Sequence, residues 1–85
     1  MEINLRFFAS VRETLGVSQE AANVPADVAT VGALRTHLVA RGDHWAAALA
    51  PGRALRMAYN QVMCSSDTAL TDGCEVAFFP PVTGG

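Results

Sequence analysis

The two ends of the chain carry strand-like segments, and this feature constrains the fold more than any other. Residues 2–9 alternate strictly, with Ile3, Leu5 and Phe7 on one face of the predicted strand. Residues 74–79, near the other end of the chain, are predicted to form the last strand. A period of two is typical of a strand with one buried face, so we expect both segments to belong to a sheet.

One helix is predicted in the middle of the chain. Val31, Leu34 and Leu38 recur at helical spacing, so their side chains share one face. Thr30 is a favourable N-cap residue, because its hydroxyl can accept a hydrogen bond from a backbone N–H of the first turn. Gly42 is the predicted terminator of this helix. We expect the apolar face to pack on the sheet.

Shorter elements are predicted in the rest of the chain. A short helix is expected to begin with a capping box at 10–13 and to end at Gly16, and a second short helix is capped by Asp43 and runs through Leu49. A strand is expected at 20–24. Two hairpin strands, at 53–59 and 62–64, are joined by a tight turn at Asn60 and Gln61. No internal repeat or linker divides these segments.

The order of the elements predicts the fold class. An early pair of strands, a crossing helix and a last strand beside the first describe an α+β protein of the β-grasp, or ubiquitin-like, type. In this fold a mixed sheet packs on one main helix, and the first and last strands are parallel neighbours at its centre. Because Pro80 cannot donate to a sheet ladder, the sheet must release the chain there. We therefore predict a single domain at 1–79, followed by an extended C-terminal tail at 80–85.

Two aromatic rings are predicted on the polar side of this sheet. Phe8 falls on the polar face of the first strand, and Phe79 falls on the less apolar face of the last. If the two strands are neighbours, the rings lie side by side where polar residues are expected. Exposed apolar patches mark protein–protein contacts, in which aromatic and arginine residues dominate. We predict a partner interface at Phe8 and Phe79, extended by Arg12 and Met63; the alternative is a loop that covers both rings.

Composition argues against several classes of partner. The net charge is −2 and the six basic residues are scattered, which argues against nucleic acid. No apolar run is long enough to cross a bilayer, so we expect no membrane partner. The first residues lack the basic stretch and cleavage pattern of a signal peptide, and we therefore expect a cytoplasmic protein.

No catalytic or metal site is indicated within the chain. Cys64 and Cys74, taken with His37 and His44, do not have the close-paired spacing of a zinc site, so we predict no bound metal. Each cysteine is expected to behave as a small hydrophobic residue. No spacing suggests a Ser-His-Asp or Cys-His set.

The last six residues, 80–85, are Pro-Pro-Val-Thr-Gly-Gly. Proline fixes φ, so Pro80 and Pro81 are expected to keep the base of this tail extended. Gly84 and Gly85 have no Cβ and can thread a narrow channel, and a terminal glycine carboxylate is uncrowded enough for another enzyme to activate. Six extended residues reach about 20 Å. The alternative is a frayed terminus without a function.

Two runs of sequence resemble the small subunit of molybdopterin synthase, the MoaD family. One is Phe-Phe-Ala-Ser-Val-Arg-Glu at 7–13, and the other is Leu-Thr-Asp-Gly-Cys-Glu-Val-Ala-Phe-Phe-Pro-Pro-Val-Thr-Gly-Gly at 70–85. The resemblance covers the whole chain in length and element order, and is most specific in the second run. The segment 19–56 is generic. Cys74 departs from the family, which more often has an acidic residue after the turn glycine.

This resemblance implies a sulfur carrier whose reactive group is its own C-terminus. An ATP-dependent activating enzyme (MoeB-like) adenylates Gly85, and a sulfur donor converts it to a thiocarboxylate. The large synthase subunit (MoaE-like) receives the tail, and sulfur passes to cyclic pyranopterin monophosphate to form the dithiolene of molybdopterin, in molybdenum cofactor biosynthesis. Val82 and Thr83 are expected to contact the channel wall of that subunit. The resemblance implies no bound cofactor, ATP being used by the activating enzyme, and active-site acids and bases that belong to the partner.

Three other functions stay open at this point. The chain is similar to sulfur carriers for other products, such as the thiazole of thiamine, although those carriers are usually shorter and lack the double proline. A ubiquitin-like protein modifier would use the same activated tail. A pure interaction domain would keep the contact patch but never have its tail activated.

Overall fold

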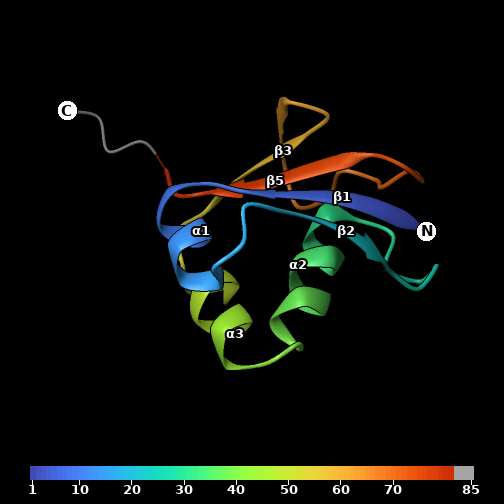
Figure 1. Ribbon diagram of the computed structural model, residues 1–85. Helices are drawn as coiled ribbons and strands as arrows, with labels where there is room; N and C mark the ends of the chain where they lie inside the picture. Colours follow the sequence, from blue (N-terminus) through green and yellow to red (C-terminus); the bar gives the residue numbers. More distant parts are fainter. Residues whose placement is uncertain (82–85) are drawn as a thin grey trace.

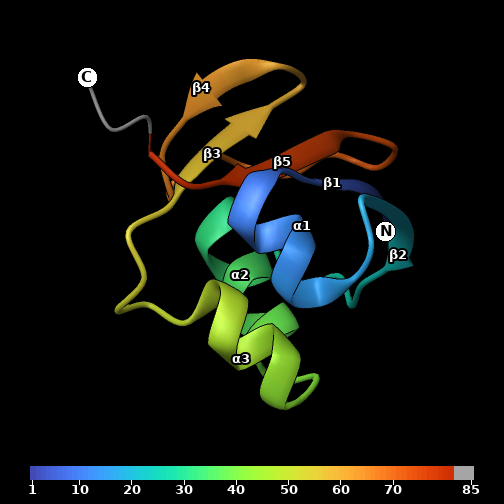
Figure 2. The same ribbon diagram turned by 60° about the vertical axis from the view of Figure 1, so that its left-hand side comes forward.

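The computed structural model describes residues 1–81, which form a five-stranded sheet with three helices on one face (Figure 1). The elements in chain order are β1 (Glu2–Phe7), α1 (Ala9–Leu15), β2 (Gln19–Asn23), α2 (Val31–Val39), α3 (Asp43–Leu49), β3 (Arg56–Tyr59), β4 (Val62–Cys64) and β5 (Glu75–Phe79). Both ribbon views show the helices below the sheet and no helix above it (Figure 2). The sheet therefore has a helix-covered face and an open face.

The strand order is β2-β1-β5-β3-β4, and β1 and β5 are parallel. The other neighbouring pairs are antiparallel. Asn60 and Gln61 form the β3–β4 turn with φ values of 47° and 69°, a pattern typical of a tight hairpin turn. The predicted parallel pairing of the first and last strands is confirmed, as is the mixed sheet of the β-grasp fold.

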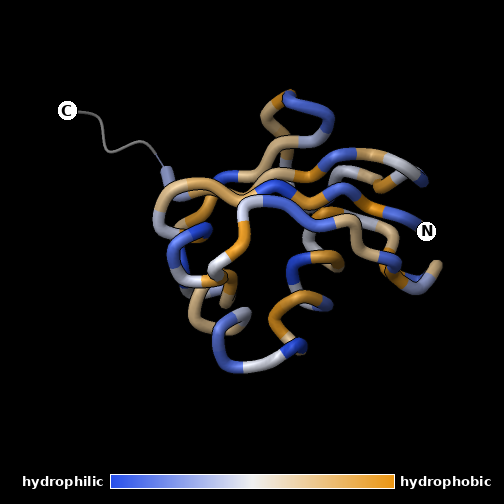
Figure 3. Tube along the Cα trace, in the orientation of Figure 1, coloured by the Kyte–Doolittle hydropathy of each residue, from blue (hydrophilic) through white to orange (hydrophobic). Residues whose placement is uncertain are grey.

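The core lies between the sheet and the helices. Ile3, Leu5 and Phe7 of β1 are buried. Figure 3 shows hydrophobic and hydrophilic positions alternating along that strand. The predicted apolar face of α2 is buried too, and the predicted N-cap is confirmed, because Thr30 Oγ1 accepts a hydrogen bond from the backbone N–H of Ala33 at 3.1 Å.

Aromatic packing joins the sheet to α3. The ring of Phe7 stacks on Phe78 with centroids 6.3 Å apart, and meets the edge of Trp45 at 5.7 Å. Leu49 at the end of α3 is also buried in the core. Trp45 and Leu49 thus attach α3 to the core.

Arg35 of α2 fixes the end of α3 through backbone carbonyls. Its Nε donates to the carbonyl oxygen of Leu49 at 2.6 Å, and its Nη2 donates to those of Ala50 and Arg53 at 2.6 and 2.8 Å. The last carbonyls of a helix lack partners within the helix, so these bonds satisfy groups that would otherwise be unpaired. Burial lowers the pKa of the Arg35 guanidinium below its ordinary value.

The predicted capping box at 10–13 is wrong. Helix α1 begins at Ala9, its N-cap is Phe8, and no side chain caps it. The reason lies in β5: the Phe8 N–H donates to the Phe78 carbonyl at 3.3 Å, which holds Phe8 in an extended conformation. The Phe8 carbonyl then accepts from the N–H of Val11, so the helix starts directly where the strand ends.

Other boundaries also differ from the sequence prediction, and the strand expected at 20–24 is β2, at Gln19–Asn23. Helix α2 ends at Val39, and Gly42, with φ of 143°, is the N-cap of α3, so Asp43 is a first-turn residue and not the cap. Strand β3 begins at Arg56 and not at Arg53. The segment before it forms a turn, in which the Arg53 N–H donates to the carbonyl of Ala50 at 2.8 Å. Arg35 donates to the carbonyl oxygens of both Ala50 and Arg53.

Within residues 1–81, none of the helices combines the length and the apolar character needed to cross a membrane.

Candidate partner-docking surface

The predicted ring pair lies on the open face, where β1 and β5 end together. Phe7 is paired with Phe78 in the parallel register, and the residues that follow them, Phe8 and Phe79, continue in an extended conformation and point to the opposite side of the sheet. The rings of Phe8 and Phe79 meet edge to face, with centroids 6.4 Å apart and planes at 85°. Phe8 is 42% exposed and Phe79 half-buried, so no loop in the described part of the chain covers Phe8. We call Phe8 and Phe79 the aromatic patch.

Met63 lies on the same open face, two strands beyond β5. It is paired with Ala58 of β3, which in turn is paired with Ala77 of β5. Met63 is 54% exposed, whereas the two small alanines between it and β1 are buried. The structure thus places Met63 on the predicted surface, at the edge of the sheet.

The backbone of Arg12 is hydrogen-bonded to a residue of the aromatic patch. Arg12 is exposed on α1, and its N–H donates to the Phe8 carbonyl at 3.4 Å. The arginine on the aromatic ring is instead Arg6, whose guanidinium carbon is 5.6 Å from the Phe8 centroid. Arg56 is paired with Phe79 across β3 and β5. An interface role of Arg12 stays a prediction.

Sequence reasoning missed Arg6 and Arg56 for different reasons. Arg6 shares the alternation of Phe8, so the signal was present along β1. The place of Arg56 beside Phe79 depends on the register of β3 against β5, which joins residues more than twenty positions apart and has no local signature.

The base of the predicted tail follows β5 directly. The strand ends at Phe79, and Pro80 and Pro81 are half-buried. The other tail residues singled out from the sequence, Val82, Thr83, Gly84 and Gly85, lie outside the described residues. Their roles, and the division of the chain into a domain and a tail, stay predictions.

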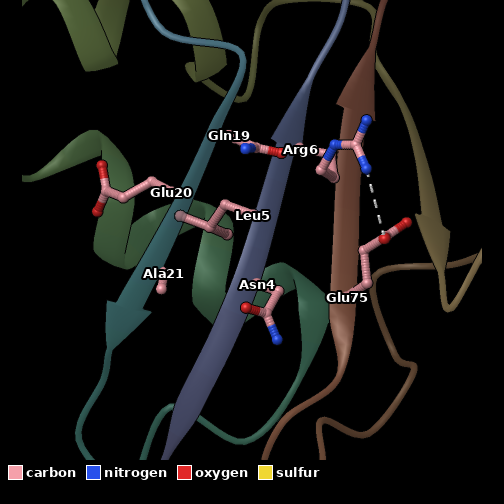
Figure 4. A pocket seen from close by; sticks show the side chains of 7 residues that line it. All are labelled: Asn4, Leu5, Arg6, Gln19, Glu20, Ala21 and Glu75. Atoms are coloured by element: carbon pink, nitrogen blue, oxygen red, sulfur yellow. Dashed lines mark ion pairs between the residues drawn. The ribbon is translucent and has the colours of Figure 1, made fainter.

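A hollow of about 380 Å³ lies on the open face across β2, β1 and β5 (Figure 4). It is lined by Asn4, Leu5, Arg6, Gln19, Glu20, Ala21 and Glu75, five of which have polar or charged side chains. Arg6 therefore belongs both to this hollow and to the rim of the aromatic patch. Among residues 1–81, no three histidine, cysteine or acidic side chains gather closely enough to hold a metal ion.

The fold and the open face define a ubiquitin-like β-grasp domain with an aromatic patch beside its C-terminal segment. Residues 5–85 match the model of the ThiS family. The chain belongs to the ThiS family.

Individual relatives are similar over nearly the full length. The chain is 55% identical over 83 residues to the molybdopterin synthase sulfur carrier subunit of Escherichia coli, covering 98% of this chain and 99% of that protein. It is 37% identical over 93 residues to small archaeal modifier protein 3 of Haloferax volcanii, covering all of both chains. The solution structure of the Haloferax volcanii HVO 2177 protein superimposes with a TM-score of 0.80 at 35% identity, covering all of this chain and 87% of that one. The resemblance to the molybdopterin synthase small subunit is thereby confirmed.

Proposed function

We propose that the protein is the sulfur carrier subunit of a molybdopterin synthase. The observation that carries this proposal is the 55% identity, over nearly the whole length of both chains, to a protein of that name. The aromatic patch next to Pro80 supports it, because a carrier that delivers its own C-terminus needs a docking surface close to the tail. The thiazole carrier is less favoured, since the relative of 55% identity is named for molybdopterin synthase.

The proposed chemistry takes place at Gly85. A carboxylate is a poor electrophile at neutral pH, so its oxygen first attacks the α-phosphorus of ATP on an activating enzyme and releases pyrophosphate. A sulfur donor then displaces AMP from the acyl-adenylate and leaves a thiocarboxylate. The terminal sulfur is a soft nucleophile that forms a carbon–sulfur bond with a side-chain carbon of the pterin precursor, while the carbon–oxygen bond at that carbon breaks and the oxygen group leaves with the bonding pair. Hydrolysis of the remaining acyl–sulfur bond returns the glycine carboxylate, and two such rounds build the dithiolene.

The proposed division of labour assigns no catalysis to the chain itself. The large synthase subunit contacts the aromatic patch, Met63 and Arg12, and receives the tail in its active site. Acids, bases and ATP belong to the large subunit and the activating enzyme, and the carrier holds no cofactor of its own. We place all these steps in the cytoplasm, with no nucleic acid or membrane involved.

The test is the intact mass of the protein after incubation with the activating enzyme, ATP and a sulfur source. We expect a gain equal to the exchange of one oxygen for one sulfur, located at Gly85 by fragmentation. With the large subunit and the pterin precursor added, the mass should return to its starting value as molybdopterin forms.

The matched control is the chain without Gly84 and Gly85. This variant should keep its circular dichroism spectrum and its midpoint of unfolding, because the core lies within residues 1–79, while sulfur transfer is abolished. Full molybdopterin formation by the shortened chain would contradict the proposal. An unchanged mass of the intact chain would do so too, provided that the activating enzyme modifies another carrier.

Protein modification is the second candidate function, because small archaeal modifier protein 3 is similar over the whole length of both chains. The same activated glycine would then form an amide with a lysine of another protein. Peptides that carry a Gly-Gly remnant on lysine, present with the full chain and absent with the shortened one, would reveal this activity.

A further inference from the structure

We infer that Arg6 is the main polar contact of the docking surface. Its guanidinium forms a hydrogen-bonded ion pair with a carboxylate side chain of the large subunit when that subunit covers the aromatic patch. The inference rests on the proposed function, because it concerns the same docking surface. It adds the chemistry that the partner must present and the residue that selects for it.

Arg6 is poorly satisfied within its own chain. A guanidinium has five N–H donors. Its one ion pair in the described part of the chain joins Nη1 to Glu75 Oε1 at 3.8 Å, which is longer than a hydrogen bond. The Nε atom is buried and has no hydrogen-bond partner among the described residues. A buried, unpaired donor lowers stability, so the fold alone gives little reason for an arginine at this position.

The position of Arg6 ties it to the aromatic patch. Its side chain extends from β1 across β5, as Figure 4 shows, and its guanidinium lies 5.6 Å from the centre of the Phe8 ring. The side chain is 41% exposed, so a large part of it is in contact with water in the free carrier. A partner that packs on Phe8 and Phe79 must strip much of this water away.

A charge that loses its water needs a compensating partner. Leaving the guanidinium unpaired under an apolar surface would cost more than the packing of the patch provides. A carboxylate matches its planar fork and can accept two hydrogen bonds at once. Arg56, paired with Phe79, adds a second positive charge at the same end of the sheet. The complementary surface is therefore apolar at its centre and acidic beside Phe8.

Glu75 offers the competing solution. Its side chain is 26% exposed and its Oε1 lies 3.8 Å from Arg6 Nη1, so the carboxylate is close enough to move within hydrogen-bond distance of the guanidinium when water is displaced. In that case the large subunit need not supply any acid. The experiment must separate these two arrangements.

The experiment titrates the intact carrier into the large subunit by calorimetry at low and at high salt. Arg6→Met keeps the apolar stem but removes the charge, and we expect its Kd to rise about 30-fold or more. Its affinity should also depend less on salt than that of the wild type. In urea denaturation the same variant should be as stable as the wild type or more stable, because the buried donor is gone. Arg6→Lys keeps the charge without the fork and should bind less tightly than the wild type.

Two controls decide the interpretation. Arg53→Met makes the same change in net charge in the turn before β3, and should leave the affinity unchanged. Glu75→Gln should bind as tightly as the wild type or more tightly; a loss as large as that of Arg6→Met would overturn the partner carboxylate in favour of Glu75.

Equal binding by the wild type and Arg6→Met would overturn the inference while leaving the proposed function intact. Failure of the wild type to bind the large subunit would remove the proposed function, and this inference with it.

Discussion

The two faces of the sheet carry matching aromatic pairs in opposite environments. On the helix-covered face Phe7 and Phe78 are 1% and 0% exposed and their rings stack. One residue further along each strand, Phe8 and Phe79 meet edge to face on the open side. The parallel register of β1 and β5 creates both pairs at once. Residues of the same type, adjacent in sequence, therefore serve the core on one face and a surface on the other.

The arginines of the two faces differ in the same way. Arg35, on the helix-covered side, donates to three backbone carbonyls and fixes the end of α3. Arg6, on the open side, has a buried Nε without a partner among the described residues. The fold thus satisfies the guanidinium on the helix side, whereas the open side holds a guanidinium nitrogen that the described part of the chain leaves unpaired.

The largest effect is expected at the inner aromatic pair. Phe78→Ala should lower the free energy of unfolding by about 3–5 kcal/mol, because it leaves a cavity against Phe7 in the core. Urea denaturation followed by the fluorescence of Trp45, the single tryptophan, measures this loss. Phe79→Ala is the matched control and should cost less than about 1 kcal/mol. Equal losses for the two variants would break the distinction between the faces.

A smaller loss of stability is expected at Arg35. Arg35→Met should cost about 2 kcal/mol, because three carbonyl oxygens lose a charged donor at the end of α3. Arg12→Met, at an exposed position, is the control and should have little effect on thermal unfolding.

The pH dependence of this effect follows from the pKa of Arg35. Burial lowers that pKa in the folded state, so linkage raises stability with pH only in the strongly alkaline range where the guanidinium titrates. Since arginine stays protonated near neutrality, the difference between the wild type and Arg35→Met should be constant there. If the difference in stability between the wild type and Arg35→Met changes across neutral pH, the hydrogen bonds of Arg35 depend on the titration of another group.

The smallest effect in free energy is expected for binding of the large subunit when the outer aromatic pair, Phe8 and Phe79, is changed. Phe79→Ala should weaken binding to the large subunit by about 1–2 kcal/mol, because it removes a central apolar contact. Val62→Ala is the matched control: Val62 is 67% exposed but is paired with Tyr59, so it belongs to the other side of the sheet. Calorimetric titration that gave the same affinity for Phe79→Ala and the wild type would argue against the aromatic patch as the docking site.

The parts of the fold that sequence patterns predicted are those set by local interactions. The alternation in β1, the hydroxyl of Thr30 and the turn at Asn60 and Gln61 each depend on residues a few positions apart. The aromatic patch was also predictable, because the β-grasp order makes β1 and β5 neighbours and their alternation places Phe8 and Phe79 on one face.

The errors concern contacts between distant segments. Ser10 has the sequence context of an N-cap, yet the hydrogen bond from Phe8 to Phe78 moves the start of α1 to Ala9. Arg53 was expected to begin a strand, yet it lies in a turn, where its carbonyl accepts a hydrogen bond from Arg35 of α2. A local pattern contains no information about such partners.

The sequence by itself determined the element types, the two faces of the first and last strands and the family of the chain, because periodicity and short motifs are properties of neighbouring residues. Only the tertiary structure decided where α1 begins, which arginine lies on Phe8, and which polar groups find acceptors. The physical reason is that hydrogen bonding and desolvation depend on strand register and packing, which bring together residues as far apart as Arg6 and Glu75.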